Sequence, residues 1–210
     1  MSFLTFILQN HNAVLAHTLE HLRLVAASIF FAVLIGIPLG ILITRRPILK
    51  RPILGFANAV QTIPSLALFG ILLPAPWIGA RASRLVILAL TLYALLPLIR
   101  NTYAGIKGVD PAVIEAARGM GMTDRQLLWQ VELPLSLGVI IAGVRVATVL
   151  SIGIATIAAA IGAGGLGEYI FRGLAMVNNA VIFAGAVPAA LLALLADGGL
   201  GWLEKRLTPR

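Results

Sequence analysis

The sequence predicts an all-α membrane protein with about five transmembrane helices, and three observations support this fold class. Of the 210 residues, 60% are hydrophobic and 11% are charged, and the mean hydropathy is +0.99. An average soluble domain has about 25% charged residues. Several apolar runs have the length of about 20 residues that crosses a bilayer as a helix, and Lys and Arg gather in the loops of one side. Spans and short loops use up the chain, so residues 1–210 are expected to form a single transmembrane domain.

The apolar runs place the spans in chain order. They lie near residues 22–43, 54–73, 83–100, 138–161 and 180–201. Each is expected to be helical, because backbone polar groups in lipid must be satisfied within the segment. The segment before the first run, which includes His11, has no basic region of a cleavable signal and is expected to be mobile.

Positive charges divide unequally between the two sides of this bundle. Ten lie in the loop 44–52, the connection 104–134 and the tail: Arg45, Arg46, Lys50, Arg51, Lys107, Arg118, Arg125, Lys205, Arg206 and Arg210. The other side has three, which are Arg81, Arg84 and Arg172. Cytoplasmic loops are enriched in Lys and Arg, so the amino terminus is predicted outside and the carboxyl terminus inside. The net charge of +8 is attributed to this topology and predicts no nucleic-acid binding.

Two spans contain breaks that could line a transport pathway. Thr62-Ile63-Pro64-Ser65 places two hydroxyls beside a proline within the second run, and Pro97 interrupts the third. Such breaks occur where neighbouring helices or cavity water satisfy the freed backbone groups. Thr62, Pro64, Ser65 and Pro97 are therefore candidate pathway residues, although Gly and Pro are common in spanning helices generally.

The connection 104–134 predicts two short helices joined by a turn. Asp110 before Pro111 is typical of an N-cap followed by proline at the first helical position. Gly119 and Gly121 predict the end of this first helix.

A second helix is expected after that turn. Thr123 and Gln126 fit a capping box, and the helix should end at Leu133-Pro134.

The same connection contains a motif of fixed spacing. Its residues are Glu115, Ala116, Ala117, Gly121, Val131, Leu133 and Pro134. This pattern resembles the EAA loop of the permease subunits of ABC importers. The resemblance implies a multi-pass protein of the bacterial cytoplasmic (inner) membrane. It implies that the loop docks on a separate ATPase subunit, which binds ATP and Mg, while this chain has no catalytic residue, no metal and no cofactor of its own. A second permease, identical or paralogous, and an extracytoplasmic substrate-binding protein are the other partners that it implies.

Other segments are similar to one branch of these permeases. They are 21–25, 36–40, 61–67, 96–102 and 162–167 with Ile170. The branch is the osmoprotectant type, which imports quaternary amines such as glycine betaine, choline and carnitine. Since small five-span permeases share much of this pattern, an importer of another small solute, such as an amino acid, is the alternative.

Two further motif matches point to other functions. Residues 162–167 satisfy G-x-G-x-x-G, but no strand precedes them and no acid follows at the required distance, so a tight turn is predicted. His17, Glu20 and His21 satisfy H-x-x-E-H, the inverted zinc-peptidase motif. Without an evident third ligand, an interfacial turn exposed to headgroups and water is expected. A membrane zinc metallopeptidase and a non-transporting scaffold remain the alternatives from other classes.

Ionisable residues within the spans are few. Arg145 and Asp197 lie toward predicted cytoplasmic ends, where their side chains are expected to snorkel to the interface. A proton relay of buried carboxylates is therefore poorly supported.

Overall fold

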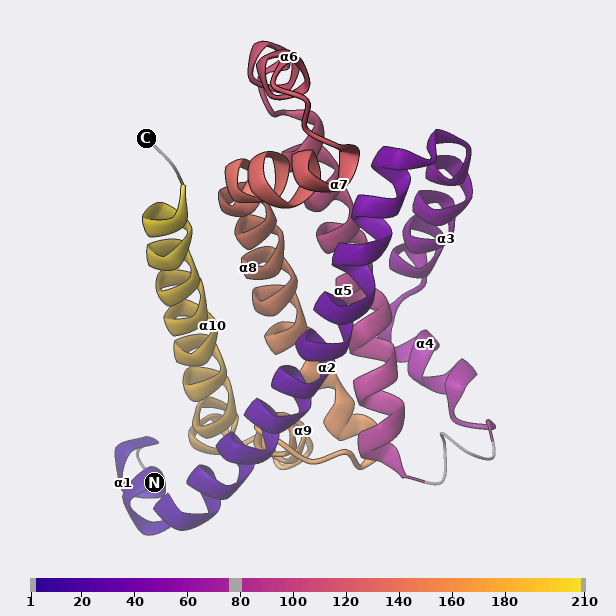
Figure 1. Cartoon of the computed structure of the whole chain (residues 1–210). Helices are drawn as coiled ribbons and strands as arrows, with labels where there is room; N and C mark the ends of the chain where they lie inside the picture. Colours follow the sequence, from indigo (N-terminus) through magenta and orange to yellow (C-terminus); the bar gives the residue numbers. More distant parts are fainter. Residues whose placement is uncertain (1–2, 76–80, 209–210) are drawn as a thin grey trace.

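The computed structural model describes residues 3–75 and 81–208, and all regular elements within these ranges are helical (Figure 1). Four helical stretches are long and apolar enough to cross a membrane: α2 (His11–Arg45), α5 (Ala82–Lys107), the stretch Asp124–Ile161 that contains α8 (Leu133–Ile157), and α10 (Asn179–Leu207). A fifth crossing would be the pair formed by η1 with α3 (Pro47–Leu49, Lys50–Thr62) and α4 (Ser65–Leu72), bent by 102°. These helices confirm the predicted all-α membrane fold class, with four to five candidate spans where about five were predicted.

The central helix of the bundle is α5. In its most apolar window 67% of the residues are buried, against 28–33% in the other three long stretches. Its side chains form the main core with those of α2, α4 and α8, including Leu24, Val25, Phe69, Leu85, Leu90 and Ile152. The helices α2 and α8 pack directly on α5, whereas α10 packs on α8 and α9 (Gly167–Ala175).

The bent pair and α5 satisfy each other's broken hydrogen bonds. Pro97 has no N–H, so the carbonyl of Tyr93, four residues earlier, loses its helical donor. The Gln61 side chain donates to this carbonyl at 2.9 Å. In return, the Tyr93 hydroxyl donates to the carbonyl of Ile63, at the break between α3 and α4. The two predicted breaks thus form one joint.

The first long helix begins before the predicted start of the first span. We expected the span to start near residue 22, after a mobile segment, but α2 begins at His11 and follows α1 (Phe3–Gln9). Phe6 and Ile7 of α1 pack against Tyr169 and Val181. Polar residues that bind within the protein lower the hydropathy of the first turns of α2, so the apolar run did not reveal this part of the helix. Where the membrane span itself begins stays a prediction.

Two ends of the bundle are distinct in Figure 1. The carboxyl terminus, the loop around Pro47–Leu49 and α6 (Pro111–Gly119) lie at one end, the α6 end. At the other, the α9 end, lie α1 and α9 (Gly167–Ala175), a short helix that the sequence analysis did not predict. Segments with nine of the ten counted positive charges thus share one end, Arg210 lies outside the described residues, and the cytoplasmic location of this end stays a prediction.

Candidate coupling surface

The helix α6 begins as predicted. The Asp110 side chain accepts a hydrogen bond from the backbone N–H of Ala112 at 2.8 Å, and Pro111 occupies the first turn. This cap satisfies one of the backbone donors that a helix leaves free at its start.

The end of α6 explains the glycine of the motif. Gly121 has φ +82°, a conformation that L side chains rarely adopt. Its N–H bonds to the Arg118 carbonyl at 2.9 Å, and the N–H of Met122 bonds to the Ala117 carbonyl at 3.2 Å. These two bonds form a Schellman motif. An added Cβ at Gly121 would have no atom within 4 Å, so the backbone and not the surrounding space requires glycine here.

The second helix begins as predicted but does not end where expected. Thr123 and Gln126 form both bonds of the capping box at the start of α7 (Asp124–Leu127). The chain then passes through a π-helical turn, η2 (Leu128–Glu132), directly into α8. Pro134 lacks an N–H and is tolerated in the first turn of α8. The preceding turn is wider, with the N–H of Leu133 bonded to the carbonyl of Leu128.

The motif residues differ in exposure. Glu115, Ala116, Gly121 and Pro134 are exposed, and Val131 and Leu133 are half-buried. Ala117 is only 2% exposed, so its side chain faces this chain and not a free surface. The exposed motif positions on α6 are therefore Glu115 and Ala116.

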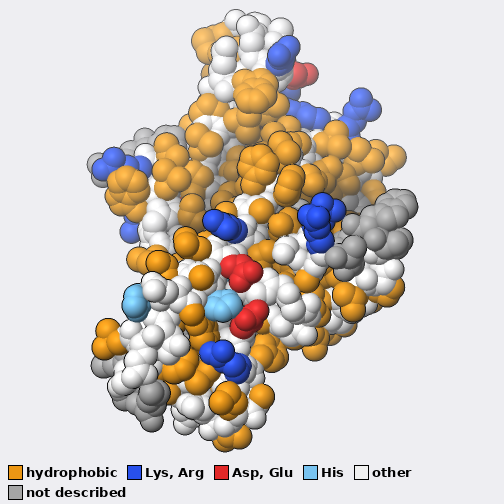
Figure 2. All heavy atoms as spheres, turned by 90° about the horizontal axis from the view of Figure 1, so that it is seen from below, with side chains coloured by type: hydrophobic (Ala, Val, Ile, Leu, Met, Phe, Trp, Pro, Cys, Tyr) orange, Lys and Arg blue, Asp and Glu red, His pale blue; other side chains and the backbone are white. Residues whose placement is uncertain are grey.

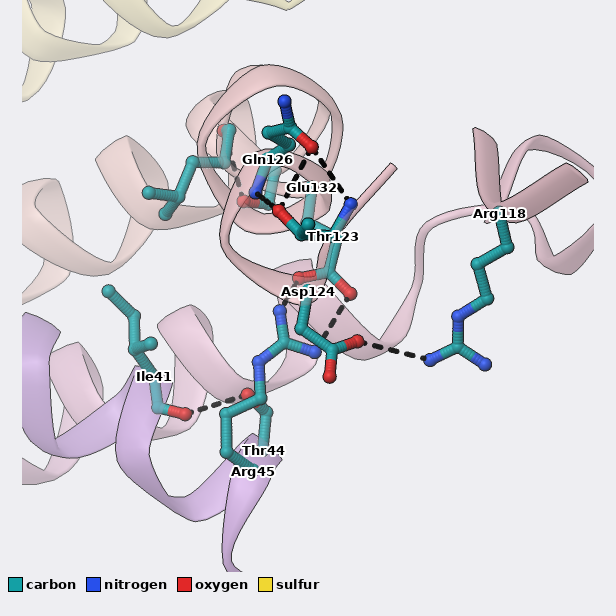
Figure 3. Close-up of polar contacts among 10 residues, drawn as sticks. Ile41, Thr44, Arg45, Arg118, Thr123, Asp124, Gln126 and Glu132 are labelled. Atoms are coloured by element: carbon teal, nitrogen blue, oxygen red, sulfur yellow. Dashed lines mark hydrogen bonds and ion pairs between the residues drawn. The ribbon is translucent and has the colours of Figure 1, made fainter. Parts of the chain in front are cut away.

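An ion pair between the partly exposed side chain of Arg45 and the buried carboxylate of Glu132 joins the end of α2 to the π-helical turn (Figure 3). Both terminal nitrogens of Arg45 contact the Glu132 carboxylate, and the Nη1–Oε1 distance is 3.2 Å. Glu132 is 4% exposed. Sequence reasoning missed this pair because the partners are 87 positions apart and the family pattern leaves position 132 free.

The candidate pathway residues fall into two groups. Thr62 and Pro64 are exposed at the break and Ser65 is half-buried, whereas Pro97 is buried within α5. The bonds of Gln61 and Tyr93 described above link the segment before Pro97 to the break. The structure therefore brings the two breaks together but places only the first at a surface.

The two other motif matches contact each other at the α9 end. The Glu20 carboxylate accepts a hydrogen bond from the Gly165 N–H at 2.9 Å. His21 is fully buried, and its Nε2 lies 3.1 Å from the carbonyl of Ile152. These residues do not form the expected turn, because they lie within α2 and bind the loop that follows α8, and their place at the membrane interface stays a prediction.

His17 extends this contact to α9. Its Nδ1 lies 3.4 Å from the Glu20 carboxylate and its Nε2 lies 3.7 Å from that of Glu168. Figure 2, which views this end, shows a histidine side chain between acidic ones. We call His17, Glu20, His21, Gly165 and Glu168 the α9 latch. Beside it, burial raises the pKa of Tyr169, while Arg172 over its ring at 4.9 Å acts in the opposite direction.

The α9 latch does not have the geometry of a metal or nucleotide site. Among residues 3–75 and 81–208, no group of three His, Cys, Asp or Glu side chains could hold a metal ion. Gly162, Gly164 and Gly165 have φ values of +75°, +80° and +80°, which confirms the predicted tight turn.

The charged residues within the spans bind one another. Arg145 of α8 contacts Asp197 of α10 through Nε at 2.6 Å and Glu204 through Nη1 at 3.2 Å. This pairing was not predicted from the sequence, and the expectation that Arg145 and Asp197 snorkel to the interface stays a prediction. Their pairing could have been found, since Asp197 and Glu204 are seven residues apart and share a face of α10.

Comparisons with known proteins agree with this arrangement. Residues 36–209 match the family model described as "Binding-protein-dependent transport system inner membrane component". The chain is 47% identical over 206 residues to the glycine betaine/carnitine/choline transport system permease protein OpuCD of Bacillus subtilis, covering 98% of this chain and 89% of that protein. It is 42% identical over 209 residues to the carnitine transport permease protein OpuCB of Listeria monocytogenes, covering 100% and 94%.

A solved structure has the same fold. An inward-facing form of the MetNI methionine ABC transporter superposes with a TM-score of 0.83 at 24% identity, covering 93% of this chain and 96% of that one. The family match and the full-length relatives show that this chain belongs to the binding-protein-dependent transport system inner membrane components, the permease subunits of ABC importers.

Proposed function

We propose that this permease carries quaternary ammonium osmoprotectants of the glycine betaine, choline and carnitine type across the cytoplasmic membrane. The support is the identity of 40–47% over nearly the whole chain to permeases named for these solutes. An amino acid is the second candidate, because a methionine transporter has the same fold. At 24% identity that likeness concerns the fold alone, so the osmoprotectants are favoured.

We propose further that α6 is the contact for a separate ATPase subunit that binds ATP and Mg. The observation that carries this proposal is the exposure of Glu115 and Ala116 on a capped helix that extends beyond the bundle (Figure 1). A second permease, identical or paralogous, and an extracytoplasmic binding protein complete the importer.

Transport in this scheme is a shift between inward-open and outward-open arrangements. Closure of the ATPase dimer moves α6, and the spans swing about the joint formed by the breaks at Pro64 and Pro97. Thr62, Pro64 and Ser65 line the route at this joint. The chain itself performs no covalent step.

The test is reconstitution of the importer in proteoliposomes with Glu115→Lys. Reversing an exposed charge at a docked surface should lower bound ATPase and uptake at least tenfold, which corresponds to about 1.4 kcal/mol of lost interaction. Lys107→Glu is the matched control, an exposed charge reversal in the same connection outside the motif, and should change both less than twofold. Wild-type coupling in Glu115→Lys would contradict the docking role.

The substrate is tested in the same vesicles. Labelled glycine betaine should be taken up, and choline and carnitine should compete with it. Uptake of methionine in place of glycine betaine would favour the second candidate.

A further inference from the structure

The ion pair between Arg45 and Glu132 connects two parts of the chain that the family motif does not link. Arg45 is the last residue of α2, and Glu132 ends the π-helical turn between the coupling motif and α8. The motif specifies Val131, Leu133 and Pro134 but leaves position 132 open. Its carboxylate is nevertheless among the few buried charged groups of the described residues.

Burial gives this pair a strict geometry. A carboxylate that is 4% exposed needs a partner, because removing it from water without one is unfavourable. Arg45 meets both oxygens of Glu132 with two nitrogens, which fixes the orientation of the two groups as well as their distance. The pair therefore holds η2 in one position relative to α2.

Apolar packing between these elements leaves space beside the pair. A groove of about 410 Å³ lies next to it, and Pro38, Ile41, Leu42, Arg46, Leu128 and Trp129 line it together with Arg45. Close-packed side chains between α2 and η2 would transmit a displacement from one element to the other. Where a groove separates the two elements, side-chain packing does not transmit it. The ion pair is thus the rigid connection at this point.

The π-helical turn is the place where a displacement of α6 would enter the bundle. Its widened hydrogen bonding, caused by Pro134, interrupts the regular helix directly before α8. Turns of this kind are frequent at functional sites. Without a further contact, motion of α6 and α7 could be absorbed there.

We propose that Arg45 and Glu132 are positioning residues that transfer the movement of the coupling motif to α2. The inference rests on the proposed coupling role of α6. In it, α8 receives the movement through the chain and α2 receives it through the ion pair. The two helices then move together when the ATPase closes.

The decisive variant replaces both partners with apolar residues, Arg45→Met with Glu132→Met. An apolar pair leaves no buried unpaired charge, so the complex should assemble at the wild-type level. Without the link, uptake per ATP hydrolysed and the stimulation of ATPase by loaded binding protein should fall at least tenfold per assembled complex. A purely structural role would change the amount of complex and leave these ratios unchanged.

Two single variants complete the test. Glu132→Gln keeps the shape of the side chain and should lose coupling in the same way, and it decides the question if the double variant does not assemble. Arg46→Met, at the exposed neighbouring cation, should couple like wild type. Wild-type ratios in an assembled double variant or in Glu132→Gln would overturn the proposal. The proposed docking role fails separately, if Glu115→Lys couples normally.

Discussion

Glu115 and Ala116 are exposed on α6, whereas His21, at the opposite end of the bundle, is fully buried and bonded to Ile152. Both ends contain residues of a sequence motif. At the α6 end the residues of the motif come from one continuous segment and part of the motif faces outward. At the α9 end two motifs that are about 145 positions apart face each other.

A motif match can arise from contact with a partner or from packing within the chain, and the two ends illustrate these two cases. In a pattern that holds over 20 residues, packing within the chain accounts for Ala117 and Gly121 but not for the exposed side chains of Glu115 and Ala116, which favour a partner. The matches H-x-x-E-H and G-x-G-x-x-G are short, and here internal packing accounts for them. Glu20 caps the glycine turn, and His21 fills the space beside it.

The distinction between the α6 end and the α9 end requires that the two ends face opposite sides of the membrane. The sequence contains no cysteine, so single cysteines can be introduced without background. A cysteine at Ser83, near the α9 end, should react with an impermeant maleimide in intact cells, and one at Met120, which is 74% exposed, should react only after permeabilisation. Labelling of Met120 from outside would contradict the orientation and the coupling role together.

A matched pair of glycines tests the packing of the two ends. An added Cβ at Gly167, the first residue of α9, would lie 1.9 Å from the backbone oxygen of Thr156, while one at Gly119 would meet nothing within 4 Å. Gly167→Ala should lower the free energy of unfolding by about 3 kcal/mol or more, because a backbone atom cannot easily move. Gly119→Ala should stay within about 0.5 kcal/mol. Thermal unfolding in detergent measures both, and equal melting temperatures would contradict the comparison.

A smaller effect is expected at the two histidines of the α9 latch. His21→Ala removes a buried ring and its bond to Ile152, so the free energy of unfolding should fall by about 2–3 kcal/mol. His17→Ala, at a side chain that is 26% exposed, should cost about 1 kcal/mol or less. Metal analysis of the same samples distinguishes the peptidase alternative, which requires stoichiometric zinc in the wild type and its loss from both variants.

Much of the fold could be predicted from local sequence. Spans follow from apolar length, and the caps of α6 and α7 follow from residues within four positions of one another. The start of α2 and the helix α9 could not be predicted in this way. Their polar residues are satisfied by partners more than 100 positions away, so a hydropathy window counts them as exposed.

In the candidate site, too, the local features could be predicted from the sequence and the contacts between distant segments could not. The resemblance to the EAA loop singled out Glu115 and Gly121, and the φ of Gly121 agrees with the expected turn, while the coupling role of both residues stays a prediction. The inward direction of Ala117 was not predictable, since it depends on how α6 turns relative to the following segment. Arg45 and Glu132 needed the structure, because only the fold brings the end of α2 to the π-helical turn.

The two caps of α6 have a thermodynamic consequence for association. A free helix of nine residues is marginal in water, but α6 is closed at its start by Asp110 and at its end by the turn at Gly121. Ordering a flexible segment on binding would cost about 1–2 kcal/mol of conformational entropy per residue. Because α6 is already ordered, a partner that binds it does not have to supply this entropy. In the proposed mechanism, the free energy of docking then remains available for displacing α2 and α8.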